Sequence, residues 1–133
     1  MSSKLACSKT IIISTTLSYT LCIIIGSLIK LQNVIPDTVQ YSDKTLHLVG
    51  YSGLCFFWCT YYLYVHNQKK YIWKPIVVSS FIGIFMEVLQ YSCTSYRSLD
   101  VLDIVANTIG VFLGAGFYLL ILKIWVTLKK RSA

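Results

Sequence analysis

Residues suited to ionic and acid–base chemistry recur at helical spacing in this chain, first around position 47. Lys44, His47 and Tyr51 are separated by three and four residues, and Asp43 falls in register with the last two. Residues at such spacings share one face of a helix. A lysine and a histidine on one face can hold an anion or exchange a proton. These residues mark a candidate binding or catalytic face.

Two later segments carry faces of the same kind. Gly83, Glu87 and Gln90 are separated by four and three residues. Further along the chain a single stripe comprises Asp100, Asp103, Asn107, Gly110 and Gly114. Three segments thus each present a polar face, and their chemistry depends on the helices that bring them together.

Those helices are predicted to span a membrane. Of the 133 residues 56% are apolar, and the mean hydropathy of +0.65 points to lipid as the solvent. A bilayer core about 30 Å thick requires about 20 helical residues. Apolar runs predict four transmembrane helices, at residues 10–29, 45–65, 75–92 and 101–122. We expect an all-α, polytopic membrane protein, a four-helix bundle that forms a single domain over residues 1–133.

The distribution of charge predicts how this bundle is oriented. Short cytoplasmic loops collect Lys and Arg. Most of the basic residues precede the first span, connect the second to the third, or follow the fourth. The other side holds only Lys30, Lys44 and Arg97, together with all the acids. Both termini are therefore expected in the cytoplasm. Although the net charge is +7, the basic residues fall in short clusters between apolar runs, as an orientation signal does, so no nucleic-acid partner is predicted.

Glu87 lies too deep to face lipid without cost. It precedes the end of its predicted span by five residues, which places it about 7 to 8 Å inside the helix end. An ionisable group at that depth should point into the bundle toward a partner. Arg97 is the expected partner, with Lys44 as the second choice.

The three polar faces, taken in order along the chain, resemble the VanZ-like family. The resemblance rests on Asp43-Lys44-x-x-His47-x-x-x-Tyr51, then Gly83-x-x-x-Glu87-x-x-Gln90, then Arg97-x-x-Asp100-x-x-Asp103-x-x-Ala106-Asn107-x-x-Gly110, within residues 43–116. The family often has Pro or Gly before the arginine, whereas Ser95-Tyr96 stands here. The resemblance implies a multi-pass protein of the bacterial cytoplasmic membrane. The family's namesake is associated with resistance to the glycopeptide teicoplanin.

Our first functional hypothesis is an outward-facing site for a lipid-linked cell-wall precursor or an anionic lipid headgroup. Lys44 and Arg97 would hold a phosphate or carboxylate, and Tyr51 would contact the apolar part. The predicted ligand-binding residues are Asp43, Lys44, His47, Tyr51, Glu87, Gln90, Arg97, Asp100, Asp103 and Asn107. The expected partners are membrane lipids or such a precursor. The sequence is also compatible with a homo-oligomer.

The alternative is a membrane-embedded hydrolase or phosphatase in which His47 and Glu87 act as acid and base. Asp100 and Asp103 could then hold a divalent metal through oxygen ligands. The sequence has no Ser-His-Asp pattern, zinc signature or phosphate-binding loop, so we favour binding without catalysis and predict neither a cofactor nor a metal site.

Two further interpretations remain. A transporter would be expected to carry internal repeats, which this sequence lacks. In the structural interpretation the polar residues only hold the bundle together, and Gly110-x-x-x-Gly114 fits it because small residues let helices approach closely. Cys55 and Cys59, which share a helix face, indicate packing rather than metal binding.

Overall fold

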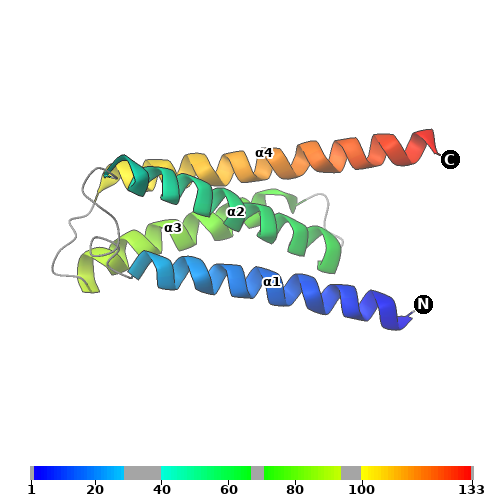
Figure 1. Ribbon diagram of the computed structural model, residues 1–133, viewed down its shortest axis with the longest axis horizontal. Helices are drawn as coiled ribbons and strands as arrows, with labels where there is room; N and C mark the ends of the chain where they lie inside the picture. Colours follow the sequence, from blue (N-terminus) through cyan, green and yellow to red (C-terminus); the bar gives the residue numbers. More distant parts are fainter. Residues whose placement is uncertain (1, 29–39, 67–70, 94–99, 133) are drawn as a thin grey trace.

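The protein consists of four long helices. The computed structural model describes residues 2–28, 40–66, 71–93 and 100–132. The helices are α1 Ser2–Leu28, α2 Gln40–His66, α3 Trp73–Cys93 and α4 Val101–Arg131. All four are long and apolar enough to cross a membrane. They run side by side with both chain ends at the same end of the bundle (Figure 1). The predicted four-helix membrane bundle is confirmed.

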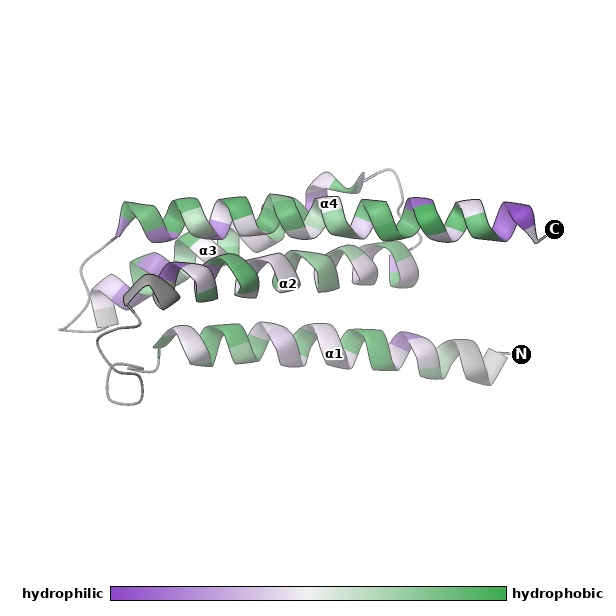
Figure 2. Cartoon of the chain, turned by 45° about the horizontal axis from the view of Figure 1, so that its top comes forward, coloured by the Kyte–Doolittle hydropathy of each residue, from purple (hydrophilic) through white to green (hydrophobic). Residues whose placement is uncertain are grey.

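All four helices are longer than the apolar runs that predicted them, α1 and α4 by the most. α1 begins at Ser2 rather than residue 10, and α4 continues to Arg131 rather than residue 122. The prediction followed hydropathy, whereas the hydrogen bonds of a helix continue beyond the last apolar residue. With 31 residues α4 is about 46 Å long, which exceeds a bilayer core of about 30 Å. Its hydrophilic C-terminal turns therefore project past the apolar part of the bundle (Figure 2).

Local sequence signals fix both ends of α4. Asp100 adopts an extended backbone conformation, and its carboxylate accepts a hydrogen bond from the Leu102 amide at 2.8 Å. It is thus an N-cap that satisfies one amide of the first turn. The last turn carries Lys129, Lys130 and Arg131, whose charges suit the negative end of the helix dipole.

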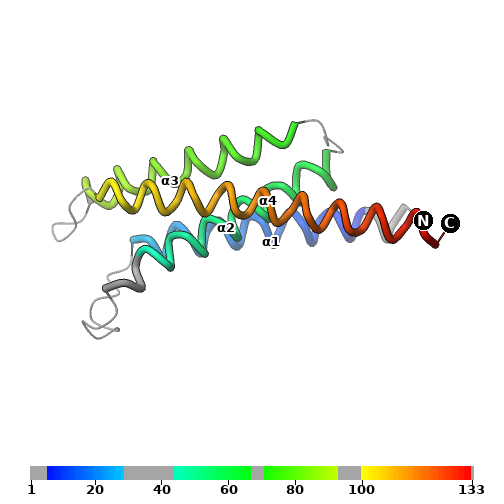
Figure 3. Tube along the Cα trace, turned by 90° about the horizontal axis from the view of Figure 1, so that it is seen from above, coloured from blue at the N-terminus to red at the C-terminus, as the bar shows by residue number. Residues whose placement is uncertain are grey.

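The closest helix pair is α2 with α4. Gly110 and Gly114 lie directly against the backbone carbonyls of Leu48 and Ser52, so closely that a Cβ atom at either glycine would overlap them. The predicted close approach at Gly110-x-x-x-Gly114 is confirmed, and its partner is α2. This pairing leads into a core formed by Tyr51, Leu54, Cys55, Cys59, Val111, Ala115 and Tyr118. α3 packs on the pair and lies to one side of the other helices (Figure 3).

The outer surfaces of the helices are apolar. Phe81, Val101 and Phe112 are exposed by 68%, 63% and 60%. A soluble protein rarely leaves so many large apolar side chains in contact with water, whereas lipid tails accommodate them without cost. The exposed surface therefore fits a protein whose flanks face lipid.

Hydrogen bonds from hydroxyl groups attach α1 to the bundle. Tyr19 donates to the Gly50 carbonyl at 3.2 Å, and Thr16 donates to the Phe57 carbonyl at 3.4 Å. The same Thr16 hydroxyl lies closer to the Ile12 carbonyl of its own helix, at 2.8 Å, so the two carbonyls share its single proton. Such bonds explain how an apolar helix tolerates its hydroxyl residues.

Candidate functional site

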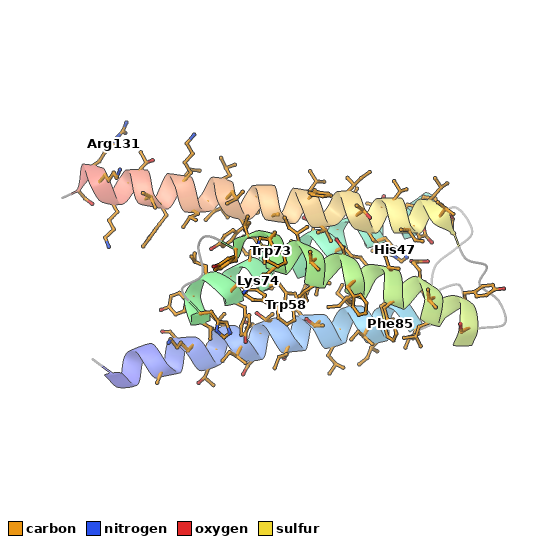
Figure 4. All side chains as sticks on the ribbon, turned by 180° about the vertical axis from the view of Figure 1, so that it is seen from behind. His47, Trp58, Trp73, Lys74, Phe85 and Arg131 are labelled. Carbon is orange, nitrogen blue, oxygen red and sulfur yellow. The ribbon has the colours of Figure 1, made fainter. Side chains whose placement is uncertain are left out.

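The three predicted polar faces meet at the end of the bundle opposite the chain termini. In Figure 4 His47 lies at the far end of the molecule from Arg131. His47, Glu87, Asp103 and Asn107 are all buried, although they come from three helices, α2, α3 and α4. The three polar helix faces predicted from the sequence are therefore brought together in the fold.

Asn107 connects the histidine to the deep carboxylate. Its Oδ1 lies 3.0 Å from Nδ1 of His47, and its Nδ2 donates to Oε1 of Glu87 at 3.4 Å. The same Oε1 is 3.7 Å from the histidine Nδ1. Since the amide donates to Glu87, its oxygen accepts from His47, which assigns a proton to Nδ1. The three side chains form a network across three helices, here called the inner network.

Lys44 forms the outer part of the site. Its Nζ lies 2.7 Å from Oδ2 of Asp100 and 3.2 Å from Oδ1 of Asp103. The side chains of Lys44 and Asp100 are 43% and 42% exposed, whereas that of Asp103 is only 9% exposed. The Lys44–Asp100 pair thus lies at the exposed edge of the site, and Asp103 lies between this pair and the inner network.

The Asp100 carboxyl is expected to titrate below an ordinary aspartate. The hydrogen bond from the Lys44 ammonium, aided by the Leu102 amide, lowers the pKa of Asp100. Any stability from this bridge is therefore present above the ordinary aspartate pKa and is lost as pH falls through the lowered value. In a Lys44→Met variant the pKa should rise toward normal, as measured by NMR of the labelled carboxyl. An unchanged titration would contradict the bridge.

Carboxylates outnumber ammonium groups among the described side chains of the site. Among the described side chains of the site, the carboxylates Glu87, Asp100 and Asp103 face one ammonium, that of Lys44. Two of these carboxylates, Glu87 and Asp103, are buried, with 3% and 6% of their surface exposed. Buried charge is costly unless it is paired. These two carboxylates therefore need polar partners inside the bundle, and the described ones include Asn107 for Glu87 and Lys44 for Asp103.

The other predicted site residues have different positions. Tyr51 is only 1% exposed, and its ring lies parallel to that of His47, with the centroids 6.3 Å apart. Gln90 donates to the Ser27 carbonyl and so joins α3 to α1. The side chains of Asp43 and Arg97 lie outside the described part of the chain. The expected pairing of Glu87 with Arg97 is therefore not described, and Lys44, the second choice, bonds to Asp100 and Asp103 instead.

Two contributions to the site had weak or no sequence signals. Gly83 makes room for Tyr51, because a Cβ there would lie 3.1 Å from the tyrosine Cε1. The spacing of Gly83 from Glu87 predicted which helix face it lies on, but not that it makes room for Tyr51. The Ser27 carbonyl accepts the hydrogen bond from Gln90. Every residue has such a carbonyl, so the residue type at position 27 could not predict this contact.

An apolar hollow lies elsewhere in the bundle, between α2, α3 and α4. It is lined by Cys59, Tyr62, Leu63, Tyr71, Ile72, Pro75, Tyr118, Leu119 and Leu122. Cys55 and Cys59 pack nearby with their sulfurs 4.0 Å apart, and both are buried free thiols. This hollow does not include the residues of the inner network.

Comparison with known proteins places the chain in a family. No curated protein and no solved structure matches it. The model of one protein family, VanZ/LLP1, matches residues 8–123 and so covers α2 and α3, most of α1 and α4, and the whole polar site. This match agrees with the ordered motifs on α2, α3 and α4, whose faces the fold brings together. The chain belongs to the VanZ/LLP1 family of multi-pass membrane proteins.

Proposed function

We propose that this protein binds the anionic headgroup of a lipid-linked cell-wall precursor or a phospholipid in the bacterial cytoplasmic membrane. The observation that carries the proposal is the inner network, whose two buried ionisable groups lie close to Asp103 and to the half-exposed Lys44–Asp100 pair. The site lies at the end of helices whose flanks are apolar, where a lipid headgroup would be within reach. Binding there would contribute to glycopeptide resistance by occupying or presenting such a lipid.

Packing alone does not require this network. α2 and α4 are already held together by the contacts at Gly110 and Gly114 and by the apolar core. Hydrogen bonds between membrane helices contribute only about 0.6 kcal/mol on average. Burying Glu87 and Asp103 is costly by comparison, which favours a function for which these charges are needed.

Lys44 is the described group best suited to an anionic headgroup. Its side chain is 43% exposed and lies at the start of a predicted span, where headgroups reside. A lysine ammonium has three donors, so it can bind a phosphate oxygen while keeping its bond to Asp100. Arg97 stays a predicted second cation.

Mass spectrometry of copurifying lipids tests the proposal. The wild-type protein, purified in mild detergent, should retain phosphate-bearing lipids, and Lys44→Met should reduce their amount on the order of tenfold because the anchoring charge is lost. Lys123→Met is the matched control, because this exposed lysine lies near the opposite end of α4. Equal lipid retention by all three proteins would refute headgroup binding at this site.

The proposal also requires that the polar end face outward. Two single-cysteine variants test this orientation, one carrying Ser92→Cys near the end of α3 and the other only the native Cys7. In intact cells Ser92→Cys should react with an impermeant thiol reagent. The exposed Cys7, on α1 near the other end, should react only after the cells are permeabilised. The reverse pattern would place both termini outside and overturn the orientation.

Hydrolysis of the bound lipid is the second candidate function. It is favoured by the 3.7 Å separation of His47 Nδ1 and Glu87 Oε1, since an acid–base pair needs two buried, mutually oriented groups. Purified protein should then convert a lipid precursor in detergent, and His47→Ala should abolish the conversion. Retention of an unaltered lipid would favour binding alone.

A further inference from the structure

We propose that His47, Glu87 and Asp103 form a binding site for one divalent transition-metal ion, such as Zn²⁺ or Mn²⁺. Each of the three side chains offers one ligand atom, and these atoms all lie within 4.8 Å of one another. All three are buried, and each comes from a different helix. From the sequence, a metal at this end of the bundle was considered only at Asp100 and Asp103 in the hydrolase alternative, because His47, Glu87 and Asp103 are far apart along the chain and form no ligand motif.

The geometry of the three side chains suits such an ion. Nitrogen and oxygen ligands lie about 2.0 to 2.2 Å from Zn²⁺, so two ligands of one ion are about 3 to 4 Å apart. The His47 Nδ1 and Glu87 Oε1 atoms already satisfy this spacing at 3.7 Å. An ion bound at Nδ1 would replace the proton that this nitrogen donates to Asn107. Asp103 needs to approach by only about 1 Å, which rotation of a side chain can supply. One imidazole with two carboxylates is a donor set that first-row divalent ions accept.

The charge of the site also fits a divalent cation. Two positive charges would match the charges of the two buried carboxylates, Glu87 and Asp103. Lys44 does not depend on Asp103 alone, because it lies closer to Asp100, at 2.7 Å rather than 3.2 Å. Asp103 can therefore turn to a metal while Lys44 keeps a partner.

A metal at this position would explain how an anion binds beside three carboxylates. Three protein ligands leave at least one coordination position open, as in metal sites that bind water or substrate. A phosphate oxygen of the headgroup could take this position while Lys44 contacts another oxygen. This step rests on the proposed function, whereas metal binding itself does not.

Equilibrium dialysis of the purified protein in detergent, after treatment with a chelator, tests the metal site with Zn²⁺ and Mn²⁺ separately. The wild-type protein should bind one ion of at least one metal per chain, measured by elemental analysis. Glu87→Gln and Asp103→Asn should each weaken binding at least on the order of tenfold. Lys44→Met should instead tighten it, on the order of tenfold, because the ammonium competes for Asp103 and repels the ion. Thr108→Val, whose hydroxyl bonds only within its own helix in the described structure, is the control and should bind like wild type.

The opposite sign expected for Lys44→Met distinguishes a metal site from a merely structural network. It also keeps the test decisive if the carboxylate variants fail to fold. The site is overturned if wild type binds neither ion, or if Lys44→Met binds the ion no more tightly than wild type.

Lipid retention with and without chelator then separates this inference from the proposed function. If metal binding is confirmed and chelation releases the lipid, both stand. If the lipid is retained equally after chelation, the metal does not bridge to the headgroup, but the proposed function survives. If the ion binds and no lipid copurifies under any condition, the proposed function fails and the metal site stands.

Discussion

Replacing Gly114 with alanine is expected to lower the free energy of unfolding of the bundle by about 1 to 3 kcal/mol, the usual cost of overpacking. A Cβ atom there would overlap the carbonyl oxygen of Ser52 on α2. The obstacle is backbone rather than the end of a flexible side chain, so α2 and α4 must move apart. Gly110→Ala should act in the same way through the carbonyl of Leu48. Unfolding by SDS in mixed micelles, followed by circular dichroism, measures the change.

Gly116 supplies the matched control on the same helix. A Cβ at this glycine has no neighbour within 4 Å, so Gly116→Ala adds only the better helix propensity of alanine. It should leave stability unchanged or raise it by up to about 1 kcal/mol. If all three alanine variants unfolded alike, the close approach of α2 and α4 would not be what limits stability.

Asn107→Leu should produce the second large effect, because it removes the side chain that joins His47 to Glu87. The leucine has a similar size but offers neither the acceptor for His47 nor the donor for Glu87. Leaving buried polar groups without partners costs about 1 to 3 kcal/mol. We expect a destabilisation of that size in the same SDS titration, together with reduced lipid retention because His47 and Glu87 lose their fixed positions.

The neighbouring residue controls for hydrogen-bond loss in general. Thr108→Val also removes a hydrogen bond, but that bond runs to the Ile104 carbonyl within α4 at 2.8 Å. Its loss should change the free energy of unfolding by less than about 0.5 kcal/mol. Equal effects of the two substitutions would mean that the inner network adds nothing specific to the fold.

Charge accounts for the difference between the site expected from the sequence and the site observed. The sequence hypothesis assigned Lys44 and Arg97 to an anion. The structure brings Asp103 and Asp100 to Lys44, so the described part of the site is richer in carboxylates than in cations. Such a site can still bind an anionic ligand when a divalent cation lies between the ligand and the carboxylates, as proposed above.

Much of this molecule could be predicted from the sequence, because a bilayer imposes strong rules on it. Every backbone group within lipid must be satisfied internally, so four apolar runs of suitable length had to become four helices. The spacing of three and four residues then fixed which side chains share a face. His47, Glu87, Asp103 and Asn107 were identified in this way, and all four lie together in the fold.

Only the tertiary structure decided which partner each polar group has. Register along one helix gives a face but not the rotation and offset of the helix opposite, and these depend on packing at Gly110 and Gly114. That packing brings Asn107 between His47 and Glu87, and it brings Lys44 to Asp100 rather than to Glu87. The order of the residues thus determined that a polar site forms at this end of the bundle. The close approach of α2 and α4, a contact between distant parts of the chain, determined how its charges are arranged.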